Sequence, residues 1–304
     1  MLRRRFALAP FALSSALAQN NGAARLRRLD DQISDIAARL DARLWLYVKN
    51  LDTGLDFGRA PDERVRTAST IKLPIMAAVF HLVQEGKARW DETLLLREED
   101  KVSGSGVLRE FSSGLQLPMR DVVRMMIVVS DNTATNMVLE RITADAVNDF
   151  SASLGLKDTF ALRKVRGDGN QLKAPSGWSK AGMVEENRRF GLGVSTSRDM
   201  VTLLEKLERG EVVSPEASKE MLAVLERQQD KGAIGRRLGD LRVASKSGAL
   251  DALRSDAGIV YSPGGRIAMA ITLDGMKEID YTQDNPGLLV IADVAKALVA
   301  GLSR

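Results

Sequence analysis

Apolar residues recur at helical spacing over several parts of the chain. In residues 25–41 an apolar side chain falls every three or four positions, with Asp and Arg between, and this period predicts an amphipathic helix. Ser69 opens a longer apolar stretch that ends near Gly86 and indicates a buried helix. The same reasoning predicts further helices over residues 121–129, 133–142, 145–155, 197–210, 215–228 and 286–302.

Short runs rich in β-branched and aromatic residues predict strands near both ends of the chain. Leu44–Val48 and Asp56–Gly58 flank the turn Asp52-Thr53-Gly54, which is typical of a hairpin. Further strands are expected over residues 241–246, 258–261 and 266–272. This order predicts an α+β fold, in which an antiparallel sheet built from both chain ends carries flanking helices and an all-helical lobe is inserted between its strands.

We place the folded domain in residues 25–304. Its α/β lobe takes about residues 25–60 and 205–304, and the helical lobe takes about residues 61–204. Residues 157–196 combine many glycines with charges and indicate a long loop region, and loops of this length are often functional. A cleft between two lobes is a usual place for a small-molecule site.

The first 18 residues have the pattern of an export signal. Arg3, Arg4 and Arg5 precede the apolar run 6–17, and Ala16-Leu17-Ala18 is a small-x-small cleavage site. We therefore expect a periplasmic or secreted protein, exported by the Sec or the twin-arginine route; an uncleaved anchor is the alternative. Cleavage removes three arginines and no acids, so the formal net charge of +4 falls to +1, and the sequence does not suggest a nucleic-acid partner.

The residue counts exclude several kinds of active site. There is no cysteine, which excludes disulfides, thiol nucleophiles and thiolate metal sites. The only histidine, His81, follows Ser69 by twelve positions on one expected helix, about 18 Å along its axis. A Ser-His-Asp triad on Ser69 and a zinc site built on several histidines are both excluded, and we expect no metal and no cofactor.

Ser69 and Lys72 carry the first candidate chemistry. Residues three apart share a helix face, so an amine or ammonium lies beside a hydroxyl. The N–H groups at a helix start favour an oxyanion there, and a serine needs such help to act as a nucleophile. On its own this Ser-x-x-Lys pattern is common, and a helix cap followed by a solvated lysine explains it equally well.

Two further motifs favour the catalytic interpretation of Ser69 and Lys72. Ser130-Asp131-Asn132 lies between two predicted helices, and Lys246-Ser247-Gly248 lies at the end of a predicted strand. In the order Ser-x-x-Lys, Ser-Asp-Asn, Lys-Ser-Gly, the chain resembles the class A β-lactamases and penicillin-binding proteins over about residues 25–304. The resemblance implies an enzyme, a serine hydrolase that works through an acyl-enzyme.

The resemblance also implies catalytic roles. Ser69 is the nucleophile that becomes acylated, and Lys72 takes part in activating it. Ser130 relays a proton to the leaving nitrogen of the opened lactam or peptide. The backbone N–H groups of Ser69 and Ala249 form the oxyanion hole.

The remaining motif residues are implied to bind substrate. Asn132 donates a hydrogen bond to the side-chain amide of the substrate, and Lys246 and Ser247 bind its carboxylate. Gly248 lets the substrate backbone approach the strand edge. Arg254 has two equal interpretations, a further carboxylate ligand or a surface residue.

One element of the class A pattern is missing. The Glu-x-x-Leu-Asn segment, whose Glu activates the deacylating water, does not occur between the second and third motifs. Asp168, Glu185 and Glu186 are the candidate substitutes for that base, and solvated loop carboxylates are the alternative. Without a placed base, Ser69 would become acylated and remain so.

We therefore expect β-lactam hydrolysis, the reaction that underlies antibiotic resistance, as the leading activity. The alternatives are a D-Ala-D-Ala carboxypeptidase or another penicillin-recognising acyltransferase on cell-wall peptides, and a sensor that binds β-lactams or muropeptides without hydrolysing them. The expected partner is a small-molecule β-lactam or a cell-wall peptide, with no nucleic acid, and the chain is expected to be a monomer.

Overall fold

A five-stranded antiparallel sheet brings the two ends of the chain together, in the order β2-β1-β10-β9-β8. The computed structural model describes residues 11–166 and 177–303, with side chains described from residue 22 onward. β1 pairs with β10 along its whole length, so that Leu46 lies opposite Ile271. The strands are β1 Arg43–Asn50, β2 Asp56–Arg59, β8 Arg242–Leu250, β9 Leu253–Ser262 and β10 Gly265–Asp274.

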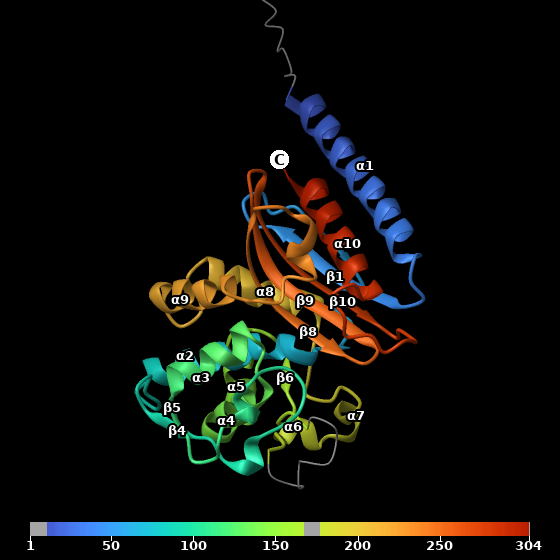
Figure 1. Cartoon of the computed structure of the whole chain (residues 1–304). Coiled ribbons are helices and arrows are strands. Elements are labelled where there is room, and N and C mark those ends of the chain that lie inside the picture. The colour runs from blue at the N-terminus through green and yellow to red at the C-terminus, as the bar shows by residue number, and fades with distance from the viewer. Residues whose placement is uncertain (1–10, 167–176, 304) are drawn as a thin grey trace, which may run out of the picture.

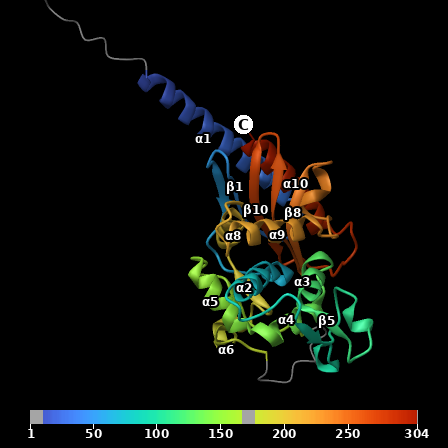
Figure 2. The same cartoon turned by 90° about the vertical axis from the view of Figure 1, so that its left-hand side faces the viewer.

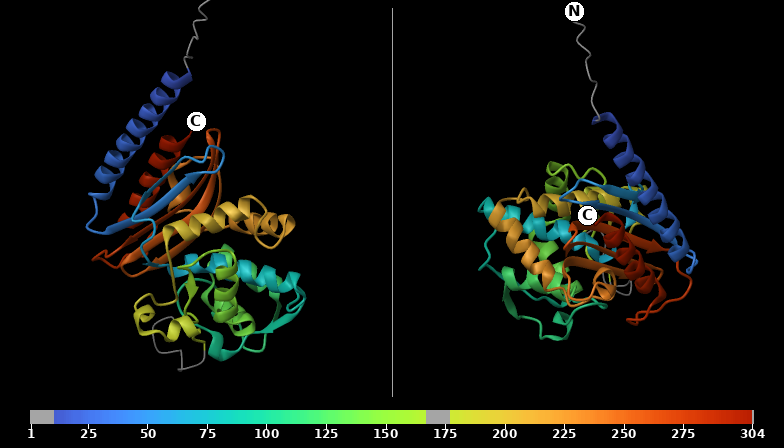
Figure 3. Two further views of the ribbon diagram at one scale, coloured as in Figure 1. Left: turned by 180° about the vertical axis from the view of Figure 1, so that it is seen from behind. Right: turned by 90° about the horizontal axis from the view of Figure 1, so that it is seen from above.

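Two helices from opposite ends of the sequence cover one face of this sheet. α1, Phe11–Ala37, and α10, Pro286–Leu302, pack side by side there (Figures 1 and 3). α10 is apolar on nearly every side, because it lies between the sheet and α1. Alternate side chains of the strands, such as Leu46 and Met269, form one core with both helices.

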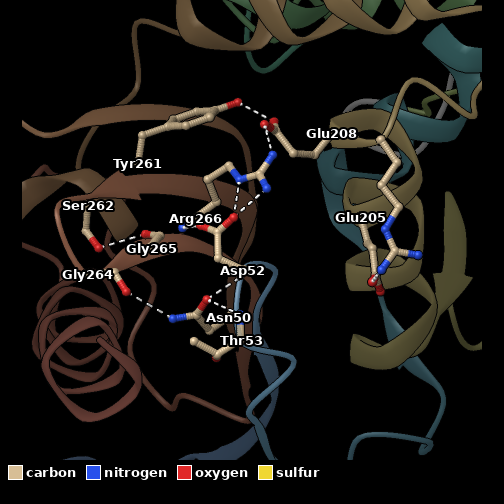
Figure 4. A network of polar contacts seen from close by, with 11 residues as sticks. Asn50, Asp52, Thr53, Glu205, Glu208, Tyr261, Ser262, Gly264, Gly265 and Arg266 are labelled. Carbon is tan, nitrogen blue, oxygen red and sulfur yellow. Dashed lines mark hydrogen bonds and ion pairs between the residues drawn. The ribbon is translucent and has the colours of Figure 1, made fainter. Parts of the chain in front are cut away.

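The other face of the sheet carries α8, Ser197–Glu208, and α9, Pro215–Glu226. The last turn of α8 is bound to the sheet by Glu208, which accepts hydrogen bonds from the Tyr261 hydroxyl at 2.7 Å and from Arg266 at 3.1 Å (Figure 4). The lobe boundary expected between residues 204 and 205 therefore falls inside a helix that packs on the sheet as one unit.

The second lobe is built around α2, Lys72–Gln84, whose first nine residues are all buried. Helices α3, α4 and α5 surround it below the sheet (Figures 1 and 2). These helices are α3 Met119–Val128, α4 Asn132–Ile142 and α5 Ala144–Ser153, and the short strands are β4 Thr93–Leu95 and β5 Gln116–Pro118. A small sheet with two one-turn helices completes the lobe: β3 Val65–Arg66, β6 Phe160–Ala161, β7 Gly193–Ser195, α6 Lys180–Met183 and α7 Glu185–Arg188.

The fold-class prediction is confirmed, and the main differences lie at element ends. The strand expected over residues 258–261 begins earlier, at Leu253, because Arg254 and Asp256 break the apolar pattern although both are buried. The helix expected over residues 25–41 begins earlier, at Phe11. Residues 1–10 of the predicted signal lie outside the described residues. In the described part of the chain, none of the helices has the length and apolar character of a membrane span.

Candidate active site

Ser69 lies in a tight 3₁₀ turn, Ala68–Ile71, that leads directly into α2. This turn packs against β8 of the sheet, at the junction of the two lobes. A Cβ on Gly248 would lie 2.8 Å from the carbonyl oxygen of Thr67 and 3.0 Å from the backbone nitrogen of Ser69. Glycine was predicted here for the approach of substrate, and the structure adds a second reason: only glycine lets β8 lie against the turn of Ser69.

Lys72 is fully buried at the start of α2 and points toward the turn between α3 and α4. Its Nζ donates to the backbone oxygen of Ser130 at 2.7 Å, to Ser130 Oγ at 3.2 Å and to Asn132 Oδ1 at 2.9 Å. Burial lowers the Lys72 pKa well below its usual value, the nearby Lys246 lowers it further, and Asp131 opposes this shift. A lysine with a depressed pKa can give up a proton and then accept one from a hydroxyl.

Ser130 joins the two lobes. Its backbone has a positive φ of 56°, which turns the chain sharply between α3 and α4. Its hydroxyl accepts from Lys72 and also from Lys246 Nζ at 2.9 Å. One hydroxyl thus lies between two buried lysines, one from each lobe, and this continuous chain of polar groups can carry a proton.

The other two residues of the Ser-Asp-Asn motif hold a neighbouring loop in place. Asp131 caps α4 through the N–H of Ala134 and also accepts from the N–H groups of Val107 and Leu108, at 2.7 and 2.9 Å. Asn132 donates through its Nδ2 to Ser103 at 3.0 Å, which leaves its second amide N–H for a ligand. The Ser-Gly-Ser-Gly turn that begins at Ser103 therefore borders the site.

The third motif places a buried cation in the middle of β8, which continues past the predicted strand end at residue 246 as far as Leu250. Lys246 is fully buried, and its Nζ donates to Ser130 Oγ and to the carbonyl oxygen of Ser247 at 2.7 Å. Burial lowers the pKa of Lys246 to about 8, although Asp256 and Asp230 oppose the shift. Asp256 lies on β9 opposite Ser247, and burial raises its pKa to about 7. The charge of this site therefore changes near neutral pH.

Arg254 is buried in β9. It is 2% exposed, so the interpretation as a surface residue is wrong. Its guanidinium donates to the backbone oxygens of Leu250 and Leu253, each at 2.6 Å, and to that of Asp280. Arg254 also lies opposite Ala249 in the β8–β9 register. It therefore fixes the hairpin that presents Ala249, which is exposed at the strand edge.

The three motifs thus meet at one junction between the lobes, and the comparison with known proteins agrees with this arrangement. The model of the β-lactamase enzyme family matches residues 28–302. The chain belongs to this family. The curated β-lactamase CARB-3 of Pseudomonas aeruginosa is 23% identical over 228 residues, 74% of each chain.

Two solved structures are similar to this family member over almost its whole length. The β-lactamase of Sphaerobacter thermophilus DSM 20745 is 30% identical with a TM-score of 0.76, and the alignment covers 90% of this chain and 96% of that one. A leucine-to-glutamate variant of PBP-A, solved as an acyl-enzyme complex with penicillin G, is 27% identical with a TM-score of 0.75, again over 90% and 96%.

Two of the three candidate deacylation bases of this β-lactamase family member belong to the one-turn helix α7. Glu185 and Glu186 are both exposed on α7, and Glu185 pairs with Arg188 at 2.7 Å. Asp168 lies outside the described residues. Within the described ranges, no group of His, Cys, Asp or Glu side chains is arranged to hold a metal ion.

One residue of the site could not be found from any sequence pattern. The Ser247 hydroxyl donates to Asp230 Oδ2 at 2.8 Å, and Asp230 comes from the loop between α9 and β8. No motif marks this loop, and the two residues lie 17 positions apart. Only the folded chain brings this carboxylate to the third motif.

Proposed function

We propose that this enzyme opens β-lactams through an acyl-enzyme on Ser69. The observation that carries the proposal is the chain of hydrogen bonds from Lys72 through Ser130 to Lys246, which crosses from one lobe to the other beside the turn of Ser69. Burying two lysines is costly, and a fold that retains both with a shared hydroxyl fits a site built for proton transfer.

In the acylation step, neutral Lys72 accepts the proton of the Ser69 hydroxyl as the oxygen attacks the lactam carbonyl carbon. The N–H groups of Ser69 and Ala249 stabilise the oxyanion that forms. The carbon–nitrogen bond then breaks, and Ser130 gives its proton to the leaving nitrogen. Ser130 is reprotonated through its hydrogen bonds with the two lysines, so the protons balance over the step.

The substrate is held by groups on both sides of Ser69. Lys246 and Ser247 would bind its carboxylate, and the free N–H of the Asn132 amide would bind its side-chain amide. Gly248 keeps β8 against the turn of Ser69, so that Ala249 can face the same carbonyl oxygen.

A second activity is favoured by the exposure of Glu185 and Glu186. If no carboxylate activates a water at the acylated Ser69, the enzyme would act as a penicillin-recognising acyltransferase or a D-Ala-D-Ala carboxypeptidase on cell-wall peptides, and penicillin would remain attached. The likeness to the PBP-A acyl-enzyme supports this candidate. A sensor that only binds is less well supported, because binding does not require a relay of Lys72, Ser130 and Lys246.

Time-resolved intact mass of the purified protein with penicillin G separates these activities. We expect an adduct on wild type and none on Ser69→Ala, with Ser34→Ala as a control that removes an exposed hydroxyl from α1. An adduct that disappears within minutes, with opened drug accumulating, supports hydrolysis. An adduct that persists for hours supports the acyltransferase, and no adduct at all contradicts the assignment of Ser69.

We also propose that the protein is exported and processed after Ala18. The support is the order of three arginines, an apolar run and a small-x-small site. Amino-terminal sequencing of protein from the periplasm or medium should begin at Gln19. A chain that begins at Met1 and stays with the membrane would favour an uncleaved anchor.

A further inference from the structure

A small interior cavity lies beside the turn that carries Ser69. Its volume is about 10 Å³, and it is bordered by that turn, by the segment that runs from β7 into α8, and by β9 and β10. Every residue that lines it is buried, and seven of the eleven carry a hydroxyl. An apolar cavity stays dry, whereas a polar one of roughly 10–15 Å³ is large enough for one water molecule.

Two of these hydroxyls are buried without a partner. Thr67 and Ser197 are each 2% exposed, and neither Thr67 Oγ1 nor Ser197 Oγ has a hydrogen-bond partner among the residues that the structure describes. An unpaired buried hydroxyl is costly, so such groups usually bond to a protein atom or to an ordered water. Because both residues line the same cavity, one water can bond to both.

The other groups around the cavity also suit a water. Ser255 Oγ and Thr272 Oγ1 are 2.9 Å apart and share one proton, so the second proton of the pair is left for another acceptor. None of the described lining residues is charged, so an ion of either sign would lack a counter-charge in this space. A water oxygen accepts two hydrogen bonds, and its own protons can reach the lone pairs of the hydroxyls around it.

Thr67 is the residue through which such a water would act on the site. Its backbone N–H donates to the oxygen of Gly193 at 3.1 Å, and its own oxygen accepts from Thr70, from the N–H at 3.1 Å and from Oγ1 at 2.8 Å. Thr67 therefore anchors the turn of Ser69 to β7. Ser197 is the first residue of α8, which packs on the large sheet. A water between the two side chains would tie the turn to the lobe that supplies the second oxyanion donor.

We propose that one water molecule is bound in this cavity by Thr67 and Ser197, and that Thr67 is thereby a positioning residue for the acylation of Ser69. The water fixes the turn against the sheet, so that the two oxyanion N–H groups keep the separation that the reaction requires. The positioning role rests on the proposed function, whereas the binding of the water does not. Thr67 acts through the backbone of the turn and not on the substrate.

A crystal structure of the wild-type protein at atomic resolution tests the binding of the water directly. We expect density for one water within about 2.5–3.0 Å of both Thr67 Oγ1 and Ser197 Oγ. A cavity without such density, or either hydroxyl bonded to a protein atom in place of the water, would overturn the proposal.

Thr67→Val tests the positioning role, because valine keeps the shape of the side chain and removes the hydroxyl. We expect the first-order acylation constant at saturating penicillin G to fall about tenfold, since small displacements of reacting groups have large effects on rate. The dissociation constant of penicillin G before acylation should not change. Thr67→Ser keeps the hydroxyl and should restore most of the lost rate. Thr202→Val is the matched control, because its hydroxyl donates to a backbone oxygen within α8, and it should leave the acylation constant unchanged.

Ser197→Ala removes the second partner of the water and should also slow acylation. If both hydroxyls act through one water, the double variant should be no slower than the slower single variant, because the two effects are then not additive. Losses that multiply would overturn the shared water. A lower melting temperature of Thr67→Val with an unchanged acylation constant would overturn the positioning role. If wild type gives no penicillin adduct, the proposed function and the positioning role fail together, and the crystal structure still decides whether the water is bound.

Discussion

Replacing Gly248 by alanine should separate the two proposed oxyanion donors. The added Cβ would lie 2.8 Å from the Thr67 oxygen, 3.0 Å from the Ser69 nitrogen and 3.1 Å from the Ala68 Cβ. Non-bonded carbon contacts are comfortable at about 3.5–4.0 Å, so β8 and the turn of Ser69 must move apart by about half an ångström or more. None of these three atoms belongs to a long side chain that could swing away, so the movement falls on the backbone.

That movement should reduce acylation far more than stability. Loss of one oxyanion donor costs on the order of 10²–10³ in rate, so we expect Gly248→Ala to acylate about a hundredfold more slowly. Overpacking a tight contact costs about 1–3 kcal/mol of unfolding free energy, which leaves the domain folded. The assay is the rate of penicillin adduct formation by intact mass, together with thermal unfolding of the same sample.

Gly235→Ala is the matched control for this substitution. Its Cβ would meet Lys231 Cβ at 3.8 Å and Val243 Cγ2 at 4.0 Å, which are ordinary contacts. It should leave the acylation rate within about twofold of wild type, since a shift of this kind needs a close contact. If Gly248→Ala also acylates within twofold, β8 does not position the oxyanion donor and the geometric argument fails.

Two further predictions concern charge. Burial lowers the pKa of Lys246 to about 8. We therefore expect kcat/KM for a carboxylate-bearing β-lactam to fall as the pH rises through about 8, because the lysine loses its proton. A pH–rate profile that is flat from pH 7 to 9.5 would contradict this. Asp256→Asn should move that decline to lower pH, because the Asp256 charge raises the Lys246 pKa. The pKa of Asp256 is raised from 3.8 to about 7. Its contribution to the free energy of unfolding is therefore fully present below about pH 4 and is lost as the pH rises through 7. Urea unfolding should show the free energy of unfolding of Asp256→Asn rising relative to that of wild type between about pH 4 and pH 7, by at most about 4 kcal/mol. A difference between the two proteins that does not change with pH would refute the raised pKa.

The sequence was sufficient for the parts of the site that are local. Ser69 and Lys72 lie within one helical turn, Ser130 lies in a turn between two helices, and Lys246 lies in a strand, so each motif could be placed on its own element, although that strand runs on to Leu250. The sheet could be predicted from the apolar strands at both ends. Their pairing follows because strands from the two ends share one apolar face that has to be buried.

The parts that could not be predicted depend on partners from distant elements. Arg254 is a buried charge whose cost is offset by backbone carbonyl oxygens, and Asp256 is a buried carboxyl that accepts from the N–H of Ile234. No pattern in β9 reveals these partners. Because these charged residues interrupt the apolar pattern, the predicted strand was shorter than β9. Asp230 belongs to a loop without periodicity, and its hydrogen bond with Ser247 forms only when the loop folds against β8.

The relative placement of the two lobes leads to a last prediction, on Gln228. This side chain is 2% exposed and makes one hydrogen bond to Ile127 and one to Asp230. The Ile127 oxygen also accepts from the N–H of Ser130 at 3.4 Å, so the bridge ends at the turn that carries the proton relay. Gln228→Met keeps the length of the side chain but removes both of its hydrogen bonds.

We expect Gln228→Met to lower the unfolding free energy by about 1–3 kcal/mol, the cost of leaving buried polar groups unpaired. That corresponds to roughly 1.5–2 °C in melting temperature per kcal/mol for a chain of 304 residues. The acylation rate, measured well below the melting temperature, should also fall, because the bridge sets the distance between Ser130 in one lobe and Lys246 in the other. Gln229→Met makes the same chemical change on an exposed neighbour and should affect neither quantity. A lower melting temperature with an unchanged acylation rate would show that the bridge only stabilises the fold, and that the hydrogen bond between Ser130 and Lys246 holds the lobes in register without it.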